Sequence, residues 1–96
     1  MAVFAVIRRR VGAYDASRPL EEQQDWRAHA DFMDRLHAEG FVALVGPLEG
    51  SRDVLLIVRA DDAGEVEMRL GEDPWTGSLL QTVRVAPWTL RLGSVD

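Results

Sequence analysis

The sequence lacks two residue types on which many active sites depend: its 96 residues include no cysteine and no lysine. Without cysteine, disulfides, thiolate nucleophiles and cysteine-based metal sites are excluded, and packing alone must close the core. Because all eleven basic residues are arginine, neither Schiff-base formation nor the phosphate-binding lysine of a P-loop is available. These absences remove several enzyme classes.

Long hydrophobic runs are also missing. The apolar stretch at 1–7 is too short to span a bilayer, and it precedes the basic cluster at 8–10, which reverses the charge order of a signal peptide. We therefore expect a cytoplasmic protein with no membrane partner. The net charge of −5, and a basic cluster that a strand would divide between its two faces, argue against nucleic acid as a partner.

What is present suits one small domain over residues 1–96. A hydrophobic content of 47% allows a single core, although a chain of this length is close to the size at which burial barely offsets chain entropy. Dimerisation would bury more surface and would help such a domain.

Hydrophobic periodicity and turn residues divide the chain into six regular elements. In chain order we expect a strand over 3–8, a helix over 22–39, strands over 41–45 and 54–59, a helix capped by 60–62 that stops before Pro74, and a strand over 81–92. A long loop over 11–22 and a hairpin turn over 49–53 complete the pattern. This order predicts an α+β, ferredoxin-like βαββαβ fold, in which two helices cover one face of a four-stranded antiparallel sheet.

Single residues also predict where some of these elements begin, end or become irregular. Gly40 should end the first helix, and residues 75–80 should add one further turn after Pro74. Pro87 marks a bulge or an edge position in the last strand, because it cannot donate a ladder hydrogen bond. The acidic residues that suit the first turn of the first helix are Glu21, Glu22 and Asp25.

The sheet face opposite the helices is expected to be covered. Strands such as 3–7 and 54–58 are apolar on both sides, and a second copy of the chain is the simplest cover for a bare apolar face. We therefore expect a homodimer formed through this face.

His29 is the candidate catalytic residue that periodicity singles out. In a helix it lies near the centre of the apolar arc, on the same side as Trp26, Phe32 and Met33. Taken alone, such a histidine is more often structural and hydrogen-bonded to backbone or water. It is also the side chain that takes and returns a proton near neutral pH, which makes it a candidate general acid or base.

Four short motifs occur in the expected order and in the expected elements. They are Trp26-x-x-His29-x-x-Phe32-Met33, Gly46-Pro47-Leu48, Asp73-Pro74-Trp75 and Val85-Ala86-Pro87-Trp88. With these motifs, over nearly its whole length, the chain resembles the YCII-related (YciI-like) family. The resemblance implies a dimeric α/β barrel built from two ferredoxin-like units. It also implies a catalytic pair formed by the helix histidine and the aspartate of the Asp-Pro-aromatic motif, here His29 and Asp73.

From the residues alone, Asp73 before Pro74 also fits an ordinary turn after a helix. As the partner of His29, its carboxylate would bond one imidazole nitrogen, fix the tautomer and raise the basicity of the other nitrogen. We expect the two helices to run roughly parallel, which separates the two residues. Either the segment after Pro74 folds back, or the pair forms across a dimer.

No cofactor and no metal are expected. The other histidine, His37, lies eight residues after His29, too far along a helix for both to bind one ion. We expect His37 on the surface near the helix C-terminus, where a positive charge suits the dipole.

These observations favour a small cofactor-independent enzyme of proton-transfer chemistry, of lyase or isomerase type. His29 would act as general acid or base, Asp73 would orient it, and the substrate would be a small organic molecule, with unsaturated or aromatic compounds as candidates. The residues expected to bind it are Phe4, Trp26, Met33, Gly46, Pro47 and Trp75. Two alternatives stay open: a cofactor-free monooxygenase, which needs only an apolar pocket, and a non-enzymatic dimeric module that binds a small ligand or regulates.

Overall fold

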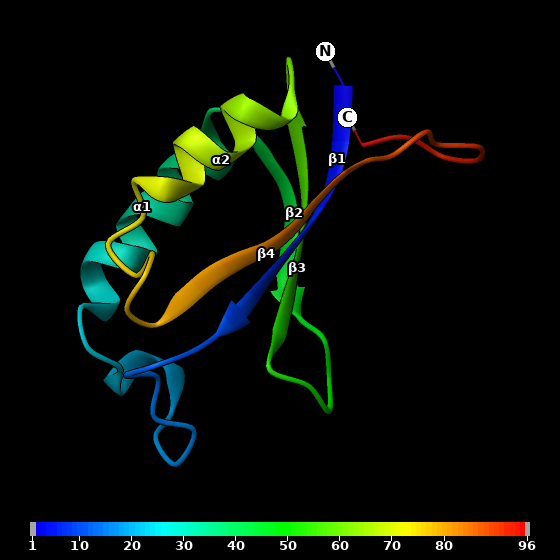
Figure 1. The fold of residues 1–96 in the computed structure, drawn as a ribbon. Helices are drawn as coiled ribbons and strands as arrows, with labels where there is room; N and C mark the ends of the chain where they lie inside the picture. The colour runs from blue at the N-terminus through cyan, green and yellow to red at the C-terminus, as the bar shows by residue number, and fades with distance from the viewer. Residues whose placement is uncertain (1, 96) are drawn as a thin grey trace.

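Four strands and two helices follow one another in the predicted order (Figure 1). The computed structural model describes residues 2–95, so Met1 and Asp96 lie outside the described part of the domain. Its elements are β1 (Ala2–Arg10), a short 3₁₀ helix η1 (Leu20–Glu22), α1 (Trp26–Ala38), β2 (Val42–Pro47), β3 (Asp53–Ala60), α2 (Ala63–Gly71) and β4 (Leu80–Pro87).

The strands form one antiparallel sheet in the order β2-β3-β1-β4. β1 lies inside the sheet, where Val6 is paired with Leu56 of β3 on one side and with Val85 of β4 on the other. The α+β class, the βαββαβ order and the antiparallel four-stranded sheet are therefore confirmed, and they are consistent with a ferredoxin-like fold.

Both helices pack on the same face of the sheet, and the core lies between the two layers (Figure 1). Side chains of a strand alternate between its faces, so Phe4 and Val6 of β1 are buried beneath the helices. They share one apolar cluster with residues from both helices and from β3, including Phe32, Leu36, Leu56, Val58, Val66 and Leu70. A second cluster of Trp75, Leu79 and Leu80 continues this core toward the end of β1.

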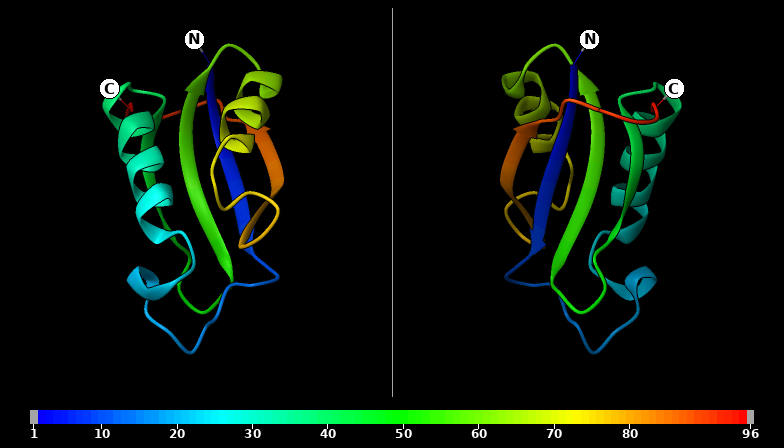
Figure 2. Two further views of the ribbon diagram at one scale, coloured as in Figure 1. Left: turned by 90° about the vertical axis from the view of Figure 1, so that its left-hand side faces the viewer. Right: turned by 90° about the vertical axis from the view of Figure 1, so that its right-hand side faces the viewer.

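The two helices run antiparallel, so the expectation of parallel helices is wrong (Figure 2). β1 and β3 are antiparallel neighbours, and each helix returns the chain against the direction of the strand that it follows. α1 and α2 consequently point in opposite directions. The N-terminal turn of α1 and the C-terminus of α2 therefore lie toward the same end of the sheet, which is where the candidate site forms.

α1 begins at Trp26 rather than at 22, because the segment before it is held in another conformation. Leu20–Glu22 forms η1, and Asp25 adopts a left-handed backbone with φ of 57°. Gln23 is buried and donates hydrogen bonds to carbonyl groups of the preceding loop. The acidic residues predicted for the first helical turn lie outside it as a result: Glu21, Glu22 and Asp25.

Two helix boundaries agree with the predictions. The side chain of Asp62 accepts a hydrogen bond from the Glu65 amide at 2.8 Å and caps α2. Gly40, with φ of 82°, follows the end of α1. Across residues 2–95, neither helix has the length and apolar content needed to cross a membrane.

β4 ends at Pro87 rather than at 92. β4 is an edge strand, so the predicted edge position of Pro87 is confirmed. The bulge lies elsewhere, opposite the step between Ile7 and Arg8. The Trp88 amide donates a last hydrogen bond to the Val3 carbonyl at 2.8 Å, and the following residues extend away from the sheet on the side opposite the helices (Figure 1).

Residues 75–80 reverse the chain instead of forming the predicted helical turn. The Trp75 carbonyl accepts hydrogen bonds from the amides of both Leu79 and Leu80 at 3.0 Å. The loop after β1 packs closely against this reversal at Gly12, where a Cβ atom would stand 2.6 Å from the Ser78 carbonyl oxygen. This close contact requires glycine, and it joins the end of β1 to the segment that carries Trp75.

Candidate active site

Asp73 lies immediately beyond α2, in a turn that fixes its side chain. Its carbonyl accepts a hydrogen bond from the Thr76 amide, and its Oδ1 accepts one from the Trp75 amide, both at 2.9 Å. Pro74 occupies the second position of this turn, where its fixed φ is favourable. The turn interpretation of Asp73 is therefore correct, and the same turn directs the buried carboxylate toward α1.

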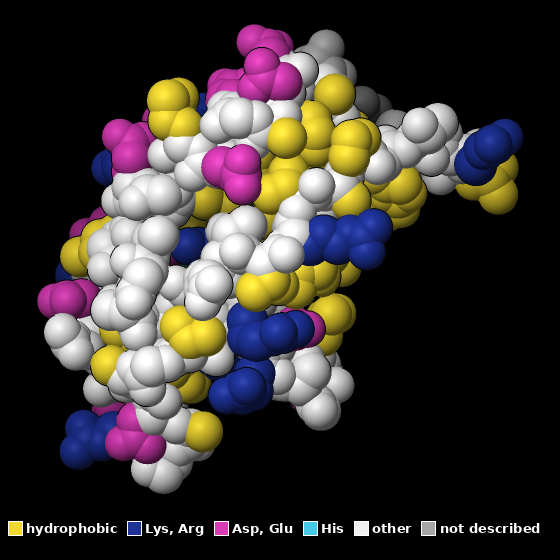
Figure 3. Space-filling view, in the orientation of Figure 1, with side chains coloured by type: hydrophobic (Ala, Val, Ile, Leu, Met, Phe, Trp, Pro, Cys, Tyr) yellow, Lys and Arg dark blue, Asp and Glu magenta, His cyan; other side chains and the backbone are white. Residues whose placement is uncertain are grey.

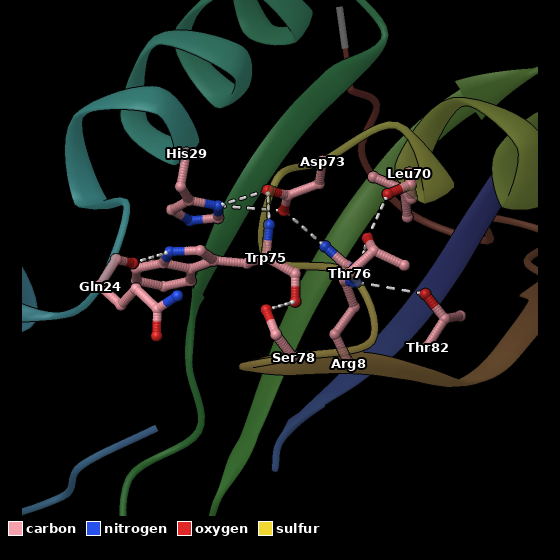
Figure 4. Close-up of polar contacts among 9 residues, drawn as sticks. All are labelled: Arg8, Gln24, His29, Leu70, Asp73, Trp75, Thr76, Ser78 and Thr82. Carbon is pink, nitrogen blue, oxygen red and sulfur yellow. Dashed lines mark hydrogen bonds and ion pairs between the residues drawn. The ribbon is translucent and has the colours of Figure 1, made fainter. Parts of the chain in front are cut away.

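His29 reaches that carboxylate within one chain (Figure 4). Its Nδ1 lies 2.9 Å from Oδ1 and 3.0 Å from Oδ2 of Asp73. The antiparallel helices bring the two residues together, because the first turn of α1 meets the chain just after α2. The pair therefore forms within one chain. Neither a partner chain nor a long fold-back of the segment after Pro74 is needed.

Arg8 is the second partner of Asp73, and sequence analysis did not identify it. Its Nη1 donates to Asp73 Oδ2 at 2.8 Å, its Nη2 to Thr76 Oγ1 at 2.6 Å and its Nε to Thr82 Oγ1 at 3.2 Å. The side chain is only 1% exposed. A signal for this position existed in the strand alternation, since Arg8 follows Phe4 and Val6 on the inward face.

The surroundings of Asp73 keep its carboxyl group ionised. Burial alone raises the pKa of Asp73, but the hydrogen bonds from His29 and the Trp75 amide, together with the charge of Arg8, hold that pKa below its ordinary value. Burial holds the pKa of Arg8 below its ordinary value, and the adjacent carboxylate offsets only part of this effect; a guanidinium remains charged in proteins. The buried cluster therefore contains an ion pair with an imidazole hydrogen-bonded to its anion.

An ionised carboxylate only accepts hydrogen bonds, so Nδ1 of a neutral His29 must carry the proton and Nε2 must carry the free lone pair. Nε2 makes no hydrogen bond, and within residues 2–95 no buried side-chain nitrogen or oxygen lacks a partner. Nε2 is therefore accessible rather than buried. The basic nitrogen of His29 remains available to another molecule.

Trp75 holds the imidazole plane. The two rings are stacked with centroids 3.8 Å apart and an interplanar angle of 3°. The indole Nε1 donates to the Gln24 carbonyl at 2.6 Å, which fixes the indole against the segment before α1 (Figure 4). Trp26 completes an aromatic group, with its ring centroid 6.0 Å from those of both His29 and Trp75. Stacking on one face and the carboxylate at Nδ1 together set the direction of Nε2.

A cavity of about 470 Å³ opens beside His29, between α1 and the sheet. Asp73 does not line it and lies behind the imidazole. Five of the six predicted binding residues line this cavity: Trp26, Met33, Gly46, Pro47 and Trp75. The remaining lining residues include several that sequence analysis did not select, among them Arg8, Arg10, Arg27, Val45, Leu56 and Leu80.

Phe4, the sixth residue predicted to bind substrate, is not among the residues that line the cavity. It shares the inward face of β1 with Arg8 but lies four positions earlier, which corresponds to roughly 13 Å along a strand. Alternation identifies the face of a residue but not its distance from the site. Phe4 belongs to the apolar core beneath the helices.

His37 lies away from the cavity. It is exposed in the last turn of α1, as expected, and its Nδ1 is 2.8 Å from the Val42 carbonyl oxygen. Among the residues that the structure describes, no three histidine, aspartate or glutamate side chains converge closely enough to hold a metal ion.

The geometry suits acid–base chemistry at one nitrogen. A histidine that is oriented by a carboxylate, lines a largely apolar cavity and has an accessible second nitrogen has the arrangement of a general base. No family model matches this chain, and no curated protein matches its sequence. The candidate site is therefore defined by the contacts of His29, Asp73, Arg8 and Trp75.

Proposed function

We propose that this protein is a cofactor-independent enzyme of proton-transfer chemistry, of lyase or isomerase type, and that it belongs to the YCII-related family. The observation that carries the proposal is the orientation of His29: Nδ1 is bonded to Asp73 and Nε2 is accessible in a residue that lines the cavity. A purely structural histidine would have both nitrogens satisfied by the protein or shut off from ligands.

In the proposed reaction, Nε2 removes a proton from a carbon next to a carbonyl group of the substrate. Asp73 accepts the Nδ1 hydrogen bond throughout and stabilises the imidazolium that forms. Arg8 forms the buried ion pair with Asp73 and, after the hydrogen bonds from His29 and the Trp75 amide, adds to the lowering of the Asp73 pKa, so it acts as a positioning residue behind the catalytic pair. The imidazolium then returns the proton to another carbon in an isomerisation, or to a departing group in an elimination. A positioned acid or base of this kind contributes about 10²- to 10⁴-fold to a rate.

The size and walls of the cavity support a small substrate with an apolar, unsaturated or aromatic body. Its volume of about 470 Å³ falls within the roughly 300–1,000 Å³ usual for small-molecule sites. Trp26 and Trp75 supply aromatic surfaces, and Met33 supplies a flexible apolar one that adapts to irregular shapes.

We also propose that two copies associate through the sheet face opposite the helices, as in a dimeric α/β barrel. That face carries the half-buried Val3, Ala5 and Ile7 of β1 and the 61% exposed Leu44 of β2. Hydrophobic side chains reach the surface on this side of the molecule (Figure 3). Arg59 and Arg84, the ladder partners of Val3 and Ile7, lie on the same face beside these apolar side chains. Exposed apolar side chains that are bordered by charged ones are typical of an interface.

Proton exchange with solvent tests the catalytic proposal without knowledge of the final product. The protein is incubated in D₂O with a panel of small carbonyl compounds that have aromatic or unsaturated bodies, and loss of the carbon-bound proton is followed by NMR. We expect catalysed exchange for at least one chemical class, and its disappearance in His29→Asn. Binding of panel members with no exchange above the buffer rate would contradict the enzyme proposal and favour the ligand-binding module.

A further inference from the structure

We infer that the cavity takes an organic acid, whose carboxylate pairs with Arg10 while its apolar body extends toward His29. This inference extends the proposed function by naming the substrate class. Its binding test does not require turnover.

Arg10 lines the cavity, and it also lines a smaller hollow together with Tyr14. It follows Arg8 by two positions on β1, so both lie on the inward face, and both line the cavity. Its guanidinium lies over the ring of Tyr14, with 4.9 Å between Cζ and the ring centroid. A cation held on an aromatic face loses less side-chain freedom when it binds a ligand.

Arg10 also lacks a counter-ion within residues 2–95. Arg8 is paired with Asp73 at 2.8 Å, whereas no carboxylate of the described residues forms an ion pair with Arg10. Arg27, at the edge of the cavity, is paired only loosely with Asp31, at 3.9 Å and with 81% of its side chain exposed. Arg10 is therefore the cation of the cavity whose charge the protein leaves uncompensated.

The charged residues that line the cavity are mostly basic. The chain has 16 acidic and 11 basic residues and a net charge of −5, and the cavity is lined by Arg8, Arg10, Arg27 and one acidic residue, Asp34. Because Arg8 and Arg27 have carboxylate partners in Asp73 and Asp31, the positive charge that remains for a ligand is that of Arg10. A positive charge beside a cavity attracts anionic ligands.

The arrangement suits a carboxylate better than a neutral polar group. Guanidinium and carboxylate form two parallel charge-assisted hydrogen bonds, which fix the orientation of a planar acid as well as its position. Arg10 and the Nε2 of His29 would then bind opposite parts of one molecule, with Trp26 and Met33 against its apolar body. Arg10 thus acts as the specificity-determining residue for the acid.

The test compares aromatic carboxylates with their neutral amides: benzoate with benzamide, and phenylacetate with phenylacetamide. Affinities are measured by NMR titration of isotope-labelled protein, and the signals of the His29 ring and the Trp26 indole report occupancy of the cavity. We expect each carboxylate to bind about tenfold or more tightly than its amide. Arg10→Gln should abolish that preference without changing affinity for the amides, and Arg10→Lys should retain part of it.

Arg35→Gln is the matched control. Arg35 also lies over an aromatic ring, with Cζ 5.5 Å from the Phe32 centroid, and it does not line the cavity; this variant should bind like the parent. A second control is Arg52→Gln, because Arg10 also lines a smaller hollow together with Arg52. Equal affinity for acids and amides, failure of every carboxylate to bind at millimolar concentration, or loss of the preference in Arg52→Gln but not in Arg10→Gln would overturn the inference.

His29→Asn separates this inference from the proposed function. That variant should keep the preference for carboxylates and lose catalysed exchange. A parent protein that prefers carboxylates but never catalyses exchange would contradict the proposed function and support the inference. Catalysed exchange of neutral substrates with no preference for acids would support the proposed function and overturn the inference.

Discussion

The imidazole of His29 lies flat on the indole of Trp75, with ring centroids 3.8 Å apart and planes 3° from parallel. Trp75 is 2% exposed, and its Nε1 is anchored to the Gln24 carbonyl. The same residue donates its amide to Asp73. Trp75 therefore supports both members of the proposed catalytic pair, one through its ring and one through its backbone.

Trp75→Phe should destabilise the protein while preserving the fold. A phenyl ring keeps a flat apolar surface but loses the hydrogen bond to Gln24 and leaves part of the buried volume empty. We expect the free energy of unfolding to fall by about 1–3 kcal/mol in urea denaturation. Trp88→Phe is the control, because Trp88 is 46% exposed, and its effect should stay within about 0.5 kcal/mol. Equal effects of the two substitutions would contradict a supporting role for Trp75.

Asp73→Asn should lower the free energy of unfolding by more than the loss of the hydrogen bond to His29 would by itself. It leaves the guanidinium of Arg8, which is 1% exposed, without a counter-ion. Breaking a buried pair from one side typically costs about 3–5 kcal/mol. The measurement is urea denaturation of the single variants and of Arg8→Met combined with Asp73→Asn, as a double-mutant cycle.

The double variant should be more stable than Asp73→Asn, because no buried charge then lacks a partner. Asp53→Asn serves as the control, since Asp53 pairs with Arg9 at the surface and such pairs contribute little. If Asp73→Asn proved no more destabilising than Asp53→Asn, the buried ion pair would not contribute to the free energy of unfolding as its geometry indicates.

Acid should destabilise the protein partly through Asp73. The pKa of Asp73 in the folded state lies below the ordinary value, which is about 3.9. As the pH falls, Asp73 is therefore protonated in the unfolded chain before it is protonated in the folded protein. The contribution of Asp73 to stability is therefore fully present above about pH 4 and is lost as the pH falls through its lower folded pKa.

This pH dependence is measured as the slope of unfolding free energy against pH below about pH 4. Arg8→Met combined with Asp73→Asn should flatten the slope relative to the parent. Asp53 also has a lowered pKa, caused by its hydrogen bond from Arg9, but this pair lies at the surface with the Asp53 side chain 23% exposed, so Asp53→Asn should retain most of the slope. A parent slope unchanged in the double variant would show that Asp73 does not contribute.

Association through the bare sheet face is tested by light scattering. We expect a mass near twice the 10.7 kDa of one chain at micromolar concentration. Leu44→Arg places a charge on the outer face of β2, where Leu44 is 61% exposed, and should shift the protein toward monomer. Met68→Arg changes a similarly exposed residue, 65% exposed on α2, and should leave the mass unchanged. A monomeric parent protein would contradict the dimer proposal.

The order of elements could be predicted because it depends on local patterns. The alternation along β1 and the apolar arc of α1 identify their faces without knowledge of partners. The cap at Asp62 and the stop at Gly40 are local as well. The start of α1 was missed because tertiary hydrogen bonds of Gln23 override helix propensity there.

The candidate site was only partly predictable, for a similar reason. His29 and Asp73 each have a local signal, one in periodicity and one in turn chemistry. The Arg8–Asp73 ion pair joins residues 65 positions apart, and no local pattern encodes such a partner. The antiparallel helices follow from the strand directions, so the contact of His29 with Asp73 within one chain could have been derived from topology alone.

The most direct test of the central claim is the rate of catalysed deuterium exchange in His29→Asn, measured beside His37→Asn. Both substitutions remove one imidazole from α1, but His37 is exposed and bonded to the Val42 carbonyl, away from the cavity. We predict that His29→Asn lowers the rate by at least about 100-fold with the fold intact, and that His37→Asn exchanges at the parent rate. Exchange at the parent rate in both variants would contradict the claim that His29 is the catalytic base.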